Sequence, residues 1–248
     1  MEPESHPPQS ALSVPMAIVV AGLLISGAVF FSRGSAGEGK GLTREALKMP
    51  ETAAVASAPS PTALRPIGVN DHIRGNPDAQ VLVIEYSDPE CPFCKRFHET
   101  MQQIIADYGK SGKVAWVYRH FPLAQLHSKA LNEAEATECA AELGGNNGFW
   151  NYIDELFRIT PSNDGLPPSE LPAIAERVGL DRAKFEKCLA GGVHEARVAD
   201  DYANAVATGG TGTPWSIVQS KTGERTTING AQPYAQVKET IDKLLLLK

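Results

Sequence analysis

The order of apolar and polar residues near the middle of the chain predicts a strand, a helix and a second strand. Residues 81–86 form a short, nearly unbroken apolar run of strand-forming residues, which is typical of a buried central strand. Apolar residues then recur at helical spacing from Phe93 to Tyr108, and Gly109 ends the pattern. Residues 114–118 are strand-forming again. The pattern therefore indicates an α/β fold.

A helix-rich block is expected from about residue 127 to 208, after the second strand. Cys139 shares a helical face with apolar neighbours, and so does Cys188. Two glycine pairs, Gly144–Gly145 and Gly191–Gly192, are expected to end these two helices. Further segments with helical spacing are residues 149–157, 170–178 and 200–207. Both cysteines should therefore face the interior of the block.

Length and charge narrow the choice of protein class. The chain has 248 residues, of which 42% are hydrophobic, and its net charge is −6. These values suit one sizeable globular domain with accessory segments and give no reason to expect a nucleic-acid partner. Residues 14–31 form one long stretch without charge, about 27 Å long as a helix. A cleaved signal peptide is the alternative, but residues 1–13 contain no Lys or Arg, so an uncleaved transmembrane anchor is favoured.

The expected organisation is a tail, an anchor, a linker and one folded domain. Residues 1–13 form the tail and 14–31 the anchor, and residues 32–66, rich in Gly, Ala, Ser and Pro, form a disordered linker. The folded domain should occupy residues 67–248. Basic residues after the anchor would keep this domain in the cytoplasm by the positive-inside rule, but long domains translocate largely regardless of charge. The chemistry expected of the cysteines in this domain instead favours the periplasm or the cell exterior.

Cys91-Pro92-Phe93-Cys94 lies between the first predicted strand and the helix. Unpaired N–H groups and the helix dipole favour an anion at the first helical turn, here the thiolate of Cys91. Pro92 costs little there, because a first-turn residue needs no N–H donor. Cys94, one turn further along, can close a ring with Cys91. A structural dithiol or half of a zinc site is the alternative, but a zinc site requires a second close Cys or His pair. We interpret the motif as a thiol redox site.

These features resemble the DsbA-like thiol–disulfide oxidoreductases of the thioredoxin fold, above all the membrane-tethered bacterial type. The similar stretches are residues 87–97, 118–123 and 212–214. The resemblance implies a thioredoxin-like α/β fold with an inserted helical subdomain. It also implies a cis peptide bond before Pro214, against the dithiol, where Thr213 and Pro214 bind the substrate backbone. Two strands of a hairpin, residues 215–219 and 225–228, should follow.

Glu85 is a carboxylate inside an apolar strand, which is costly without a partner or a role. The resemblance places here a buried acid that helps Cys94 gain or lose its proton. The alternative is an edge position or a salt bridge. Phe93 departs from the most oxidising members, which carry a histidine at that position, and it cannot donate a hydrogen bond to the thiolate.

Cys139 and Cys188 are expected to form a disulfide in an oxidising compartment, as in several tethered relatives. Two buried free thiols are the alternative.

The expected function is disulfide exchange with protein thiols, most simply as an oxidase recharged by a quinone-linked membrane oxidase. The dithiol carries the electrons, so no cofactor is expected. A reductase or isomerase of the same fold, or a non-enzymatic metal-binding protein, are the alternatives.

Overall fold

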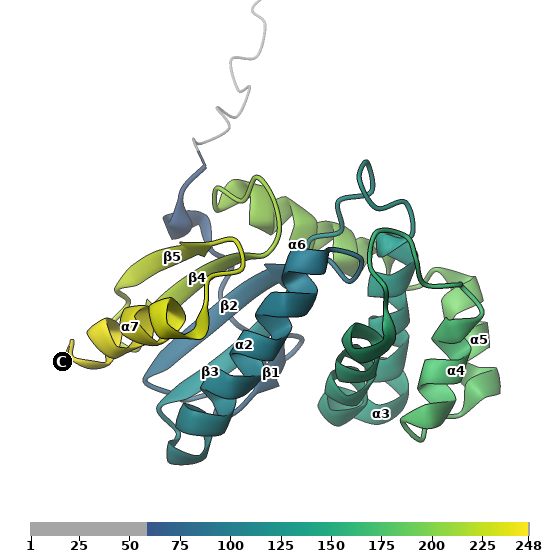
Figure 1. Ribbon diagram of the computed structural model, residues 1–248, viewed down its shortest axis with the longest axis horizontal. Coiled ribbons are helices and arrows are strands. Elements are labelled where there is room, and N and C mark those ends of the chain that lie inside the picture. The colour runs from purple at the N-terminus through teal and green to yellow at the C-terminus, as the bar shows by residue number, and fades with distance from the viewer. Residues whose placement is uncertain (1–58, 248) are drawn as a thin grey trace, which may run out of the picture. The chain divides into compact units, whose positions relative to one another are not determined.

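A mixed sheet of five strands lies at the centre of residues 59–247, the part of the chain that the computed structural model describes (Figure 1). The order is β1-β3-β2-β4-β5; β2 and β3 are parallel, and the other neighbours are antiparallel. The strands are β1 (His72–Arg74), β2 (Val81–Ser87), β3 (Val114–His120), β4 (Trp215–Ser220) and β5 (Arg225–Asn229). β2 occupies the centre, which confirms the expectation from its apolar run.

Helices cover both faces of this sheet. α2 (Pro92–Tyr108) and α7 (Tyr234–Leu245) pack on one face, and α6 (Glu195–Ala207) packs on the other (Figure 1). Alternate residues of β2 reach the two cores, since Val83 joins the α2 side and Ile84 the α6 side. The predicted strand–helix–strand unit and the C-terminal hairpin are confirmed, whereas β1 and α7 were not predicted.

The helical block lies between β3 and β4 in sequence and beside the sheet in space (Figure 1). It consists of α3 (Ala130–Ile159), α4 (Glu170–Arg177) and α5 (Arg182–Gly191), and α6 returns the chain to the sheet. Cys139 of α3 and Cys188 of α5 lie in its apolar core and form a disulfide, with their Cα atoms 5.8 Å apart.

The first glycine pair interrupts its helix, as predicted. Gly145 has φ 62° and ψ −158°, which is not helical, so α3 consists of two helical segments that meet at a kink there. The second segment contains the predicted helix at residues 149–157, whose apolar residues join the core. The second glycine pair behaves as expected: α5 ends at Gly191, and Gly192 caps it in the left-handed region.

The expected tail, anchor and most of the expected linker lie outside the described residues. Residues 59–66, which the composition assigns to the disordered linker, are ordered. A short 3-10 turn at Pro61–Ala63 leads to Leu64, which is buried beside α6, and Arg65 pairs with Asp201 at 2.6 Å. Burial and an ion pair stabilise this stretch, and a composition rich in small residues does not reveal them. Among the helices within residues 59–247, none is long and apolar enough to cross a bilayer.

Candidate active site

The dithiol lies where β2 gives way to α2. Cys91 is the residue that caps the N-terminus of α2 and Pro92 is its first helical residue, as the motif predicts. The backbone N–H of Cys91 donates to the carbonyl of Asp88 at 3.1 Å, which fixes the entry into the helix. Cys91 is 4% exposed and Cys94 is fully buried, and both are free thiols. The outer sulfur is therefore the one that a substrate can reach.

The two sulfurs differ sharply in acidity. A hydrogen bond from the Cys94 thiol lowers the pKa of Cys91 to about 6, against the effect of burial; the Thr213 side chain and backbone N–H groups of the first helical turn add to the lowering. Burial raises the pKa of Cys94 well above its ordinary value, and the neighbouring Cys91 charge raises it further. Cys91 is thus mostly thiolate at neutral pH, while Cys94 keeps its proton.

Thr213 and Pro214 lie against the dithiol. The peptide bond between them is cis. The Cys91 Sγ lies 3.6 Å from the Thr213 carbonyl oxygen, so the loop before β4 borders the reactive sulfur directly. The structure therefore brings together Cys91, Cys94, Thr213 and Pro214 from segments that are 119 residues apart between Cys94 and Thr213 in sequence.

Glu85 lies on the central strand, with its side chain fully buried. The indole N–H of Trp116 donates to its Oε2 at 2.9 Å, and its Oε1 has no hydrogen-bond partner within residues 59–247. Burial raises the pKa of Glu85 to about 8, and the charge of Cys91 adds to the effect. Neither an edge position nor an ion pair accounts for this acid, because β2 lies between β3 and β4 and Glu85 forms no salt bridge among the described residues.

Further acids surround the dithiol. Asp88, Glu90 and Glu133 are all buried. Burial raises the pKa of Glu133 to about 10, and a hydrogen bond with Glu90 adds to the rise, so Glu133 is protonated at neutral pH. No periodic signal could have revealed this pair, because its members come from different elements.

A loop of the helical block is bonded to the residue before the nucleophile. Ser162, Asn163 and Asp164 all have positive φ, at 64°, 54° and 61°. The backbone N–H of Asn163 donates to the Glu90 carbonyl at 2.8 Å, and that of Asp164 donates to Glu90 Oε2 at 2.7 Å. Residues other than glycine adopt this left-handed backbone infrequently, and the two bonds support it at residues 163 and 164. The block therefore fixes the approach to Cys91.

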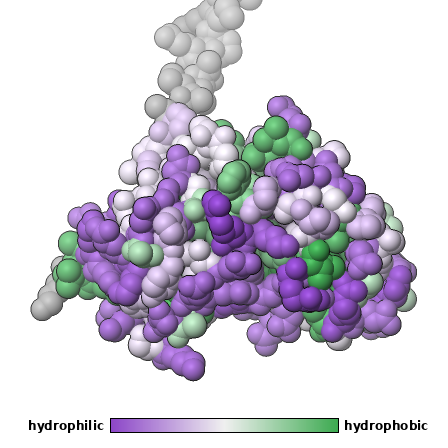
Figure 2. All heavy atoms as spheres, in the orientation of Figure 1, coloured by the Kyte–Doolittle hydropathy of each residue, from purple (hydrophilic) through white to green (hydrophobic). Residues whose placement is uncertain are grey.

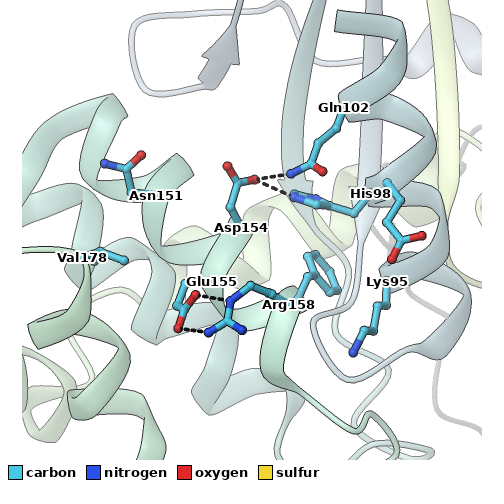
Figure 3. Close-up of a pocket in the computed structure, with 10 residues that line it drawn as sticks. Lys95, His98, Gln102, Asn151, Asp154, Glu155, Arg158 and Val178 are labelled. Atoms are coloured by element: carbon cyan, nitrogen blue, oxygen red, sulfur yellow. Dashed lines mark hydrogen bonds and ion pairs between the residues drawn. The ribbon is translucent and has the colours of Figure 1, made fainter. Parts of the chain in front are cut away.

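A polar cavity of about 470 Å³ lies between α2 and α3, and Lys95, the residue after Cys94 in sequence, is one of its lining residues (Figure 3). In Figure 3, Asp154 accepts hydrogen bonds from His98 and Gln102, and Glu155 pairs with Arg158. These charged groups satisfy one another, and neither sulfur lines the cavity. We therefore place the chemistry at the dithiol.

Comparison with known proteins agrees with this geometry. Residues 68–243 match the family model described as thioredoxin. The chain belongs to the thioredoxin family. Within that family it is a DsbA-like thiol–disulfide oxidoreductase, as the sequence motifs predict. It is similar to Pseudomonas aeruginosa DsbA2, with a TM-score of 0.63 and 28% identity over 74% of this chain and 100% of that one.

Two other solved structures have the same fold. Wolbachia pipientis alpha-DsbA1 gives a TM-score of 0.64 at 25% identity, covering 75% of this chain and 96% of that chain. Bacillus subtilis BdbD gives 0.63 at 22% identity, covering 75% and 95%. At this identity BdbD shows the shared thioredoxin-like fold alone.

Curated relatives of this thioredoxin-family chain are much longer proteins. The Na(+)/H(+) antiporter NhaA 3 of Salinispora tropica is 37% identical over 151 residues, which are 61% of this chain and 22% of the antiporter. NhaA 1 of Mycolicibacterium gilvum is 36% identical over 173 residues, or 66% and 26%. The chain thus spans about a quarter of the length of these relatives.

Proposed function

We propose that this protein is a membrane-anchored, extracytoplasmic oxidase that passes the Cys91–Cys94 disulfide to protein substrates. A substrate thiolate attacks the Cys91 sulfur of the disulfide form, and Cys94 leaves and takes up a proton. The second substrate thiolate then attacks the substrate sulfur of the mixed disulfide, and Cys91 leaves as a thiolate. The substrate loses two electrons, which the two enzyme sulfurs gain.

The asymmetric dithiol is the observation that carries this proposal. Cys91 has a pKa near 6 and Cys94 a pKa far above it, so the reduced form is stabilised as a thiolate. Stabilising the reduced form makes the disulfide a stronger oxidant. In this proposal Thr213 and Pro214 hold the substrate backbone beside Cys91, and Glu85 supplies the proton that Cys94 takes up.

Apolar surface near the dithiol supports a polypeptide substrate. The face in Figure 2 is largely hydrophilic with small separate apolar patches. Phe93 is 53% exposed within the motif itself. A cavity of about 570 Å³ is lined in part by Leu123, Leu126, Tyr202 and Thr211. Thr211 lies two residues before Thr213 in the sequence. An unfolded chain that still awaits its disulfides exposes the apolar side chains that such a surface binds.

The test is the equilibrium of the dithiol with glutathione, measured on the full chain. The reduction potential of thioredoxin is about −270 mV. A potential of the Cys91–Cys94 dithiol well above that value would support the oxidase. A potential near it would support a reductase, an alternative with which Phe93 in the motif is compatible. Cys91→Ser should abolish oxidation of a reduced test protein. The control Cys139→Ala/Cys188→Ala, which leaves the dithiol intact, should retain it. Equal activity in Cys91→Ser and the unchanged protein would contradict the proposal.

A metal carrier is the second candidate, and the structure offers it little. Within residues 59–247 two groups of three potential metal ligands converge, and neither contains Cys91 or Cys94. Metal retained through purification together with negligible exchange activity would favour this candidate.

The anchor and the outward orientation are part of the same proposal. Residues 14–31 supply the anchor, and a quinone-linked membrane oxidase would restore the disulfide. The segments that match this chain belong to longer proteins that are named as Na(+)/H(+) antiporters. Because antiporters lie in membranes, this match supports a membrane-tethered domain. Antiport itself is not proposed for this chain. Once a membrane-impermeant reductant has opened the Cys91–Cys94 disulfide, a membrane-impermeant thiol reagent applied to intact cells should label Cys91. Labelling only after lysis would contradict the orientation.

A further inference from the structure

Asp88 connects the dithiol to a histidine from a distant segment. Its backbone N–H donates to Cys94 Sγ at 3.4 Å, and its carbonyl accepts from the backbone N–H of Cys91. Its side chain is fully buried, and Oδ2 lies 2.8 Å from Nδ1 of His127. One residue therefore contacts the backbone or sulfur of both active-site cysteines and also an imidazole.

The bonds of Asp88 determine its charge. The side chain accepts hydrogen bonds from the backbone N–H groups of Glu90 and Leu123, each at 2.8 Å, in addition to the bond from His127. A carboxylate that accepts three bonds is in its ionised form, because a protonated acid would need an acceptor of its own. Burial raises the pKa of Asp88, and these donors oppose the rise. Asp88 is thus a buried anion directed at His127.

The imidazole of His127 lies beside this anion. Only 7% of the residue is exposed, and its Nδ1 donates to Asp88. Burial lowers the pKa of His127, but the hydrogen bond and charge of Asp88 outweigh it, and the Cys91 thiolate adds to the rise, so the pKa lies above its ordinary value. Asp88 thus favours the imidazolium form of His127, and the same Asp88 is hydrogen-bonded to the backbone of the nucleophile.

The remaining charged groups around His127 do not replace it. The residues concerned are Glu90 and Cys91 before α2, Lys129 and Glu133 at the start of α3, and Asp164 after α3. Glu133 is neutral, and Lys129 directs its Nζ to the carbonyl oxygens of Asp164 and Leu166. Asp164 is occupied by the backbone N–H groups of Ser128 and Lys129. Lys129 thus has acceptors elsewhere, and His127 is the basic side chain that is hydrogen-bonded to Asp88.

We propose that His127, oriented by Asp88, is a positioning residue that stabilises the Cys91 thiolate from outside the Cys-Pro-Phe-Cys motif. It supplies the positive charge that Phe93, inside the motif, cannot provide. The inference rests on the proposed function and deepens it, because stabilising the thiolate of the reduced form drives the disulfide toward the substrate.

His127→Gln tests the inference through the pH dependence of Cys91 alkylation by iodoacetamide. An opposite charge at close range lowers a thiol pKa by about one unit or more, so the variant should alkylate about fivefold more slowly at pH 6. Its equilibrium constant with glutathione should shift about tenfold toward the disulfide, or about 30 mV. His194→Gln is the matched control, because His194 pairs with Glu142 at 3.0 Å in the helical block. A His127→Gln profile identical to that of the control would overturn the inference.

A second measurement needs no variant. Coupling between two sites is reciprocal, so the thiolate must raise the pKa of His127 by as much as His127 lowers that of Cys91. An NMR titration of His127 in the full chain should give a higher pKa in the reduced form than in the disulfide form. Equal values in the two forms would overturn the inference.

These readouts are independent of the proposed function, because alkylation and NMR titration require no substrate protein. An unchanged protein that fails to oxidise any test protein, yet shows the coupling, would contradict the proposed function alone. An active protein without the coupling would contradict the inference alone.

Discussion

Two cysteine pairs lie at similar depth in this protein, one as free thiols and the other as a disulfide. Cys91 and Cys94 are 4% and 0% exposed, and Cys139 and Cys188 are 1% and 8% exposed. The first pair lies at a helix start among backbone N–H groups, acids and an imidazole. The second lies in the apolar core of the helical block, although Cys188 Sγ is also 3.6 Å from Glu142 Oε2. Burial therefore does not decide the role of a sulfur; its position at the start of a helix does.

The largest expected effect concerns the pair in the helical block. Cys139→Ala/Cys188→Ala should lower the free energy of unfolding by about 4 kcal/mol, since the disulfide closes a loop of 49 residues. Denaturant unfolding of the full chain measures the loss. Exchange activity should persist below the unfolding transition.

Alkylation tests the difference between the free dithiol and the disulfide-bonded pair. Under denaturing conditions without reductant, the protein with a reduced dithiol should gain two blocked thiols by intact mass. Four blocked thiols would mean that the second pair is free in the purified protein.

Glu85→Gln should remove a pH dependence that arises in the dithiol region. The pKa of Glu85 is raised to about 8, so its contribution to stability is full below the unfolded value of 4.5 and is lost as pH rises toward 8. The variant, which cannot ionise, should lack this loss and should be more stable than the unchanged protein at pH 8. It should also exchange disulfides about tenfold more slowly at pH 7, because Cys94 loses its proton source. An unchanged rate and pH profile would sink the proton-transfer role.

The potential of the dithiol should change its slope near pH 6. Below that pH the reduced pair takes up two protons, and above it only one, because Cys91 remains a thiolate. The potential should therefore fall by about 59 mV per pH unit below pH 6 and by about 30 mV above it. The same lowered pKa makes the reduced form gain stability as pH rises from 6 toward 9. A constant slope from pH 5 to 8 would contradict the assigned asymmetry.

Phe93→His should have the smallest effect. Phe93 is 53% exposed, so the exchange costs little packing. The new imidazole can donate to the Cys91 thiolate and should raise the potential by about 30 mV, a tenfold change in the equilibrium with glutathione. If His127 already supplies this charge, the gain should be larger in a His127→Gln background, and a gain of equal size in both backgrounds would show that the two act independently.

The sequence predicted the parts of the site that depend on neighbouring residues. β2, α2 and the position of the dithiol follow from local periodicity and from helix-start chemistry. β1 was not predicted because a strand of three residues is too short to show a hydrophobic period. The contact of His127 with Asp88 escaped because the two are 39 residues apart and meet only after the sheet has formed. Thr213 and Pro214 were found through the family resemblance and not from spacing.

The left-handed loop at residues 162–164 has a consequence for how the enzyme can be divided. Its two bonds to Glu90 tie the inserted helices to the residue that immediately precedes the nucleophile. A minimal version, trimmed to the sheet and its flanking helices, would lose those bonds and leave the residue before Cys91 without its support. The inserted helices are thus part of the active-site structure, and a version without them would need another way to hold the segment that precedes Cys91.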